Sequence, residues 1–151
     1  MKTWCAQSGK SLSGVSMSLK LEDVMIKDLI GVEVEVSVKK AAELMNIHEI
    51  GCIIVMKRGA LAGIVTERDM VKRVLLESKD PEEIKVSEIM SKPVIVGKPK
   101  MSIEGAVKLM FNRNIKKLPV VDDDNLVGLV TLTDLVLSLV TLTDLNRTRS
   151  V

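Results

Sequence analysis

Aromatic side chains are almost absent from this sequence. Among its 151 residues only Trp4 and Phe111 are aromatic, and tyrosine does not occur. Sites for single-stranded nucleic acid or carbohydrate are built from stacked aromatic rings, so the composition excludes such platforms. An excess of one charge is also missing, since the formal net charge is +2 and basic residues alternate with acidic ones. The sequence therefore argues against nucleic acid as a partner.

Cysteine and histidine are scarce. Cys5 and Cys52 have neither the number nor the spacing of a disulfide framework or a zinc site. His48 has no second metal ligand at a suitable spacing, and the three aspartates at 122–124 fit a solvated turn better than a calcium loop. No set of nucleophile, base and orienting group is visible. We therefore expect a reduced, cytoplasmic protein that binds no metal and is not an enzyme.

Long apolar runs are missing as well. The most apolar tract, residues 126–142, carries Asp134 near its centre and falls short of the roughly 18 apolar residues of a membrane span. The first 16 residues lack the apolar segment of a secretory signal. We expect a protein without a membrane segment, and a disordered leader or tag over residues 1–16.

What the sequence does contain is an internal repeat. Met25, Ser37, Gly63, Thr66 and Asp69 each recur, as the same residue type, 65 positions later and without a gap. A unit of this size buries little surface alone, so two copies are expected to pack on each other. The sequence places the first copy at 17–76, a polar linker at 77–84 and the second copy at 85–140. Residues 141–151 remain as a helical extension or tail, in which "LVTLTDL" of 129–135 recurs at 139–145.

Each copy predicts the same order of elements. Ser37 and Ser102 precede apolar residues at helical spacing, which indicates amphipathic helices. Two short apolar runs joined by a turn follow, which is typical of a strand pair, and a second helix follows each threonine. Together with a short leading strand this is an α+β fold in which two sheets face each other across a shared interface. Pro119 cannot donate to a ladder, so it is expected at a strand start or an unpaired edge.

The spacing Thr-x-x-Asp at Thr66 and Asp69, repeated at Thr131 and Asp134, has two interpretations. It is a capping box, in which the threonine and the acid each accept a backbone N–H at a helix start. Yet a glycine three residues earlier indicates that another group approaches the backbone. A helix start suits a phosphate, and a carboxylate there suits a ribose diol, so a nucleoside phosphate is the second interpretation. Arg68 adds a phosphate-binding cation in the first copy only.

Residues 24–74, ending in "GCIIVMKRGALAGIVTERDMVKRV", and residues 88–136, ending in "KLPVVDDDNLVGLVTLTDLV", resemble two tandem CBS domains, the regulatory module named after cystathionine β-synthase. The resemblance implies a pseudo-two-fold pair with two clefts for AMP, ADP, ATP or S-adenosylmethionine, and a homodimer. It assigns ribose and phosphate contacts to the threonines and aspartates of both motifs. Backbone and apolar groups of the strands would hold the adenine, and the residues expected to line the clefts are Ile30, Val32, Gly51, Cys52, Ile95, Lys116 and Pro119.

Two function classes lead at this stage, and nucleic-acid binding is a weaker third. One is a stand-alone sensor that binds an adenine nucleotide and signals to an unknown protein effector encoded separately. The other is a protein-interaction or dimerisation module whose clefts no longer bind a ligand. Calorimetric titration with the candidate nucleotides distinguishes the two classes.

Overall fold

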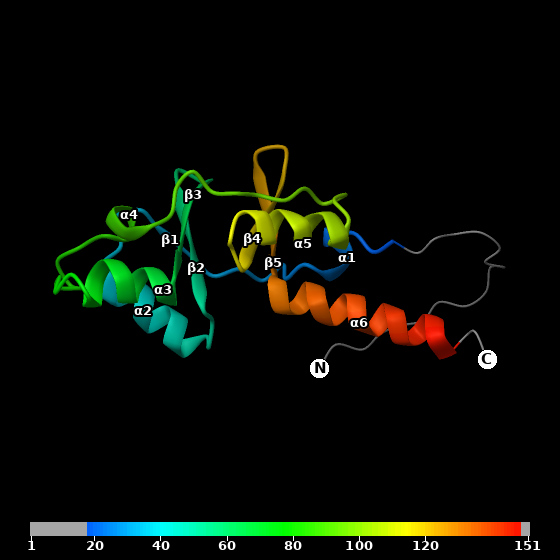
Figure 1. Ribbon diagram of the computed structural model, residues 1–151. Coiled ribbons are helices and arrows are strands. Elements are labelled where there is room, and N and C mark those ends of the chain that lie inside the picture. The colour runs from blue at the N-terminus through cyan, green and yellow to red at the C-terminus, as the bar shows by residue number, and fades with distance from the viewer. Residues whose placement is uncertain (1–17, 149–151) are drawn as a thin grey trace.

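A computed structural model describes residues 18–148, which form two lobes lying side by side (Figure 1). The predicted leader, residues 1–16, and the last three residues of the predicted tail lie outside the described residues. Lobe 1 is built around the three-stranded sheet β1-β2-β3 and lobe 2 around the two-stranded sheet β4-β5. The elements are α1 (Leu21–Val24), β1 (Gly31–Glu33), α2 (Val38–Ile47), β2 (Cys52–Lys57), β3 (Ala60–Thr66), α3 (Glu67–Met70), the π-helical turn η1 (Val71–Leu75), α4 (Val86–Ile89), α5 (Ile103–Asn112), β4 (Lys117–Asp122), β5 (Asn125–Thr131) and α6 (Leu132–Thr148).

The two predicted amphipathic helices are confirmed as α2 and α5. The hydroxyl of Ser37 accepts a hydrogen bond from the backbone N–H of Lys40 at 3.2 Å, and that of Ser102 accepts one from Gly105 at 3.1 Å. These bonds satisfy N–H groups that have no partner within the helix. The apolar stripe of each helix faces its own lobe core, with Val38, Ala41 and Met45 buried in α2 and Ile103, Ala106 and Met110 in α5.

The predicted strand pairs are confirmed as antiparallel hairpins. Strands β2 and β3 pair from Cys52–Thr66 to Lys57–Ala60, and β4 and β5 pair from Lys117–Thr131 to Asp122–Asn125. The aspartates at 122–124 form the end of β4 and its turn, as predicted. Both hairpins shift register at the same relative place, so the two copies share even this irregularity.

The expected leading strand of the second copy, near residues 94–96, does not form, and this part of the prediction was wrong. In lobe 1 the N–H of Ile54 donates to the carbonyl of Ile30 at 3.2 Å and helps to hold β1 against β2. The residue in the place of Ile54 is Pro119, which has no N–H to donate. A single parallel bridge between Gly97 and Val120 remains. Pro119 lies inside β4 at the edge of its sheet, which is the second of the two positions expected for it.

The two copies exchange their leading segments. The chain around Ile26 bridges Leu129 in lobe 2, whereas the chain around Ser91, from the second copy, bridges Ile64 in lobe 1. Leu21 of α1 is fully buried in the core of lobe 2, and Val86 of α4 is fully buried in the core of lobe 1. Each packing unit is therefore assembled from both sequence repeats, which ties the lobes together.

An apolar cluster fills the space between the two sheets. Cys52, Ile54 and Ile64 of lobe 1 and Leu129 of lobe 2 are buried there together. Because strands β3 and β5 contact each other, the sheets face one another as predicted. Hydrophobic burial across this interface favours a fixed arrangement of the lobes.

The helices that follow the two motifs differ. In lobe 1 the short helix α3 continues into the π-helical turn η1, whereas in lobe 2 the helix α6 runs regularly through Thr148 and includes the second "LVTLTDL". The same seven residues thus form strand and helix at 129–135 but only helix at 139–145. None of the helices within residues 18–148 has the length and apolar character needed to cross a bilayer.

Candidate ligand clefts at the two Thr-x-x-Asp motifs

In lobe 1 the motif forms a capping box at the start of α3. The backbone N–H and the hydroxyl of Thr66 both donate to Oδ2 of Asp69, each at 2.9 Å. In return, the N–H of Asp69 donates to the hydroxyl of Thr66 at 3.3 Å. The capping interpretation is therefore confirmed. The Asp69 side chain is 14% exposed, so the carboxylate is fixed in place and still reached by solvent.

The motif of lobe 2 repeats two of these three hydrogen bonds. The hydroxyl of Thr131 donates to Oδ2 of Asp134 at 2.6 Å, and the N–H of Asp134 donates back to it at 3.1 Å. Both residues are half-buried. The two copies therefore present matching carboxylates at the junction of a strand and a helix.

The glycine of each motif is explained by packing within the protein. A Cβ on Gly63 would lie 2.4 Å from Sδ of Met90, and a Cβ on Gly128 would lie 2.5 Å from Sδ of Met25. The expected close approach to the backbone is real, but the approaching group is a methionine of the exchanged segment. These glycines consequently give no support to a ligand, and the case for one depends on the carboxylates and their surroundings.

Several predicted cleft residues gather at the motifs. The carbonyl of Gly51 accepts the N–H of Glu67 at 3.2 Å, and Cys52 pairs with Thr66 across the hairpin. In lobe 2 the carbonyl of Lys116 accepts the N–H of Leu132 at 3.0 Å, and the next residue, Lys117, pairs with Thr131. Each motif is thus bordered by the start of its neighbouring strand.

Charged side chains from both lobes come close to Gly51. A Cβ on Gly51 would lie 3.6 Å from Oε2 of Glu67 and 3.8 Å from Nζ of Lys117, which reaches over from lobe 2. A carboxylate and an ammonium group therefore flank a stretch of backbone that carries no side chain. Glu67 was not anticipated from the sequence, although its place directly after the motif threonine marks it.

The remaining predicted residues lie in the lobe cores, within β4 or on the exposed side of α3. Ile30 and Val32 pack with the core of lobe 1, and Ile95 packs with the core of lobe 2. Their side chains therefore serve the cores of the two lobes. Pro119 is buried within β4, and Arg68 is exposed on α3.

Arg73 is a further residue at the first motif that the sequence interpretation missed. Its guanidinium lies 3.6 Å from Oδ1 of Asp69 and also donates to the carbonyl of Ile89 in α4. The pairing of opposite charges at i and i+4 on a helix is the signal that was available. Ser138 occupies the corresponding place in lobe 2, so only the first carboxylate has this cation.

Burial and nearby charges at the face between the lobes shift the pKa of the Cys52 thiol. Burial raises its pKa, the nearby Lys117 acts in the opposite direction, and Glu67 adds to the increase. A raised pKa leaves less of the reactive thiolate at a given pH.

We expect Cys52 in a Cys5→Ser background to react with a thiol reagent at pH 8 at least about tenfold more slowly in the native protein than in denaturant. Stopped-flow absorbance measures both rates. Equal rates would show that this face is open, in contradiction to the burial of Cys52.

Comparison with known proteins agrees with this architecture. The CBS domain model matches residues 21–76 and 86–141. Over 118 residues the chain is 38% identical to the CBS domain-containing protein YhcV of Bacillus subtilis, covering 78% of this chain and 84% of YhcV. The chain belongs to the CBS domain family and carries two such domains in tandem.

Two solved structures share its fold. The CBS domain pair of protein MJ0100, in complex with 5′-methylthioadenosine and S-adenosyl-L-methionine, has a TM-score of 0.72 at 29% identity and covers 79% of this chain and 94% of that one. A hexameric CBS-CP12 protein from bloom-forming cyanobacteria has a TM-score of 0.75 at 29% identity, covering 82% and 73%. CBS pairs similar to this chain thus include an adenosine-ligand complex and an oligomer.

Proposed function

We propose that this protein is a regulatory module that binds an adenosine derivative, such as AMP, ADP, ATP or S-adenosylmethionine, at one or both Thr-x-x-Asp motifs. The observation that carries the proposal is the pair of half-buried carboxylates of Asp69 and Asp134. Each is held by its capping threonine beside a strand start. The adenosine-ligand complex of the MJ0100 domain pair supports the ligand class.

The ligand roles follow from the chemistry of these groups. A carboxylate accepts hydrogen bonds from both hydroxyls of a ribose, and each motif aspartate has that role here. The strand backbone near Ile30 to Val32 and near Ile95 would hold the adenine base. Phosphates fit the cations at the motifs, which are Arg68 in lobe 1 and Lys116 and Lys117 at the strand start of lobe 2.

Occupancy is transmitted through the contact between the lobes. A ligand held at Gly51, Glu67 and Lys117 would touch both lobes, and the exchanged segments connect each motif to the opposite sequence repeat. A ligand that binds one relative pose of the lobes more tightly shifts the population toward that pose. The altered surface then acts on a separate protein effector, with the module itself working as a homodimer.

Calorimetric titration of each nucleotide into the protein and into Asp69→Ala and Asp134→Ala tests the proposal. Loss of a charged hydrogen-bond acceptor for the ribose weakens binding at that motif by at least about tenfold. Asp69→Ala also removes a carboxylate that caps α3, and Asp134→Ala removes the acceptor of the Thr131 hydroxyl, so matched controls are needed.

The chain offers such controls in its other capping boxes. Glu88 accepts the N–H of Lys85 at 2.7 Å at the start of α4, and Asp23 accepts that of Lys20 at 2.8 Å at the start of α1. Glu88→Ala and Asp23→Ala should lower stability about as much as the motif variants do and leave binding intact. An equal loss of binding in the motif and control variants would show that the motif aspartates act only through stability and do not contact the ligand.

One observation favours the second function class, a protein-interaction module without a ligand. The space between the sheets is filled by Cys52, Ile54, Ile64 and Leu129, and both motif carboxylates already accept hydrogen bonds from their own threonines. If none of the adenosine derivatives produces heat or a thermal shift, the interaction module becomes the better account.

A further inference from the structure

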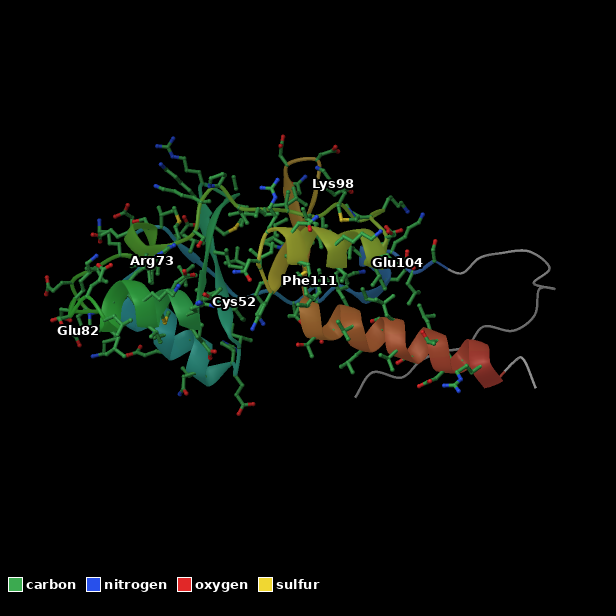
Figure 2. All side chains as sticks on the ribbon, viewed as in Figure 1. Cys52, Arg73, Glu82, Lys98, Glu104 and Phe111 are labelled. Atoms are coloured by element: carbon green, nitrogen blue, oxygen red, sulfur yellow. The ribbon has the colours of Figure 1, made fainter. Side chains whose placement is uncertain are left out.

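Arg73 connects the first motif to the exchanged segment of the second repeat, residues 86–91. It lies in the π-helical turn η1, and Figure 2 shows it between α3 and α4. Its Nη1 nitrogen is 3.6 Å from Oδ1 of Asp69 and also donates to the carbonyl of Ile89, the last residue of α4. One side chain therefore contacts both the motif carboxylate and the exchanged segment.

The two oxygens of the Asp69 carboxylate have different partners. Oδ2 accepts the N–H and the hydroxyl of Thr66, each at 2.9 Å, and these two bonds use both of its lone pairs. Oδ1 faces Arg73. A ribose that donates two hydroxyls to this carboxylate therefore needs the oxygen beside the guanidinium. Since the Arg73 side chain is 42% exposed, it can leave Oδ1 without opening the core of lobe 1.

The second copy has no such cation at the equivalent position. Ser138 lies there, and its hydroxyl donates to the backbone carbonyl of Asp134 at 2.8 Å. The backbone differs at the same place, because the chain of lobe 1 widens into η1 whereas α6 continues as a regular helix. Short π-helical turns next to helices frequently occur at functional sites. The departure from the symmetry of the repeat is thus centred on Arg73.

The residues that follow Ile89 attach the exchanged segment to the sheet of lobe 1. Met90 lies so close to Gly63 that a Cβ there would be 2.4 Å from its Sδ. Ser91 forms two backbone hydrogen bonds with Ile64 of β3, of 2.9 and 3.4 Å. A change at the motif carboxylate therefore reaches the exchanged segment through the Arg73 side chain and its bond to Ile89.

The remaining charges beside this contact are balanced and exposed. The other charged residues of α3, η1 and α4 are Glu67, Arg68, Lys72 and Glu88, and all four are exposed. In the part of the chain that the structure describes, Asp69 forms its ion pair with Arg73 and not with the neighbouring cations. Lys72 is consequently the matched control for the loss of a positive charge near the motif.

We propose that Arg73 is a positioning residue that couples ligand occupancy at the first motif to the exchanged segment. In the free protein it holds Asp69 and Ile89 together. A ribose that takes Oδ1 displaces the guanidinium, which then loses the charge that anchors it, and the exchanged segment loosens. The inference rests on the proposed function and adds the route and the sign of the coupling. Because the ligand and the ion pair compete for one oxygen, each weakens the other by the same factor.

Calorimetric titration with adenosine, an uncharged nucleoside with a free ribose diol, tests the competition. An Asp134→Ala background confines the measurement to the first motif. In this background Arg73→Met should tighten adenosine binding about threefold, the scale expected for a partly exposed ion pair. Lys72→Met removes the same charge from the adjacent residue and should leave the affinity unchanged. Circular dichroism confirms that each variant is folded.

Hydrogen exchange in the same background tests the coupling. Adenosine at saturation should increase the exchange rate of the Ser91 amide about threefold. Arg73→Met should produce this increase without ligand, and adenosine should then add nothing further. Ile26 is the equivalent residue in lobe 2, and its amide donates to the carbonyl of Leu129 at 2.9 Å. It is the internal control and should exchange at the same rate in every sample.

Faster exchange on binding is opposite to the protection that a ligand gives by simple stabilisation, so a purely structural role for Arg73 does not produce it. Adenosine affinity that is unchanged or lower in Arg73→Met, an equal gain in Lys72→Met, or slower exchange of Ser91 on binding would each overturn the coupling. If adenosine does not bind the wild-type protein, this inference is overturned as well, whereas the titrations with nucleotides decide the proposed function separately.

Discussion

Replacing Gly63 with alanine should lower the free energy of unfolding by about 2 kcal/mol, a large change for a single added methyl group. The new Cβ would lie 2.4 Å from Sδ, 2.7 Å from Cγ and 2.9 Å from Cβ of Met90. Rotation of the methionine moves its sulfur but not its own Cβ, so the exchanged segment itself has to shift. Denaturant unfolding, followed by circular dichroism, measures the loss.

Gly31 provides the matched control for this substitution. It lies in the same sheet, and a Cβ there would be 3.4 Å from its nearest neighbour, the carbonyl oxygen of Ile54. Gly31→Ala should change stability by no more than about 0.5 kcal/mol. In a Met90→Ala background the cost of Gly63→Ala should fall to about 1 kcal/mol, because two of the three close contacts are gone. An equal loss of unfolding free energy in both backgrounds would show that the effect of Gly63→Ala does not arise from contact with Met90.

This result bears on how the Gly-x-x-Thr-x-x-Asp pattern is interpreted. The glycine accommodates a methionine, and the threonine and aspartate cap a helix. Each residue of the pattern therefore has a structural role that needs no ligand. A nucleotide would donate to the lone pairs of the carboxylate that remain free. Binding therefore has to be measured against the capping controls.

The helices, hairpins and turns were predictable because their causes are local. Ser37 and Ser102 precede apolar residues at helical spacing, and the stripe of each helix is buried as the spacing predicts. The loss of the strand near residues 94–96 was predictable in principle, since Pro119 removes the donor that Ile54 supplies in the first copy. Pro119 was expected at a strand start or an unpaired edge, but its effect on the neighbouring strand was not anticipated.

The exchange of leading segments was beyond the reach of sequence patterns. Met25 and Met90 are equivalent in the repeat, and so are the glycines that they contact, so the alignment is unchanged whether each segment packs on its own sheet or on the other. Choosing between the arrangements depends on the three-dimensional path of the chain. Similarly, no residue pattern predicted the π-helical turn η1. The hydrogen bond from Arg73 to the carbonyl of Ile89 depends on the position of α4. Of the candidate site, the motif residues were found from the sequence, whereas the weak sequence signals of Glu67 and Arg73 gained meaning only from the structure.

Replacing Leu21 with alanine should destabilise lobe 2 by about 3 kcal/mol, although Leu21 precedes every element of lobe 1. Its side chain is fully buried in the core cluster that includes Ile103, Met110 and Leu118, and a Cβ on Gly97 would lie 2.7 Å from Cδ1 of Leu21. Removing a buried leucine leaves a cavity that the lobe 2 core cannot readily fill.

Hydrogen exchange measured residue by residue locates the damage from Leu21→Ala. Protection should fall first in α5, β4 and β5, whereas Ile89→Ala, at a fully buried site in the second repeat, should loosen α2, β2 and β3 instead. Leu76→Ala, at a position that is 73% exposed, serves as the control and should leave both lobes protected. The two core variants thus exchange their effects between the lobes, because each core is completed by the other repeat. Loss of protection in lobe 1 from Leu21→Ala would instead mean that each repeat folds on its own leading segment.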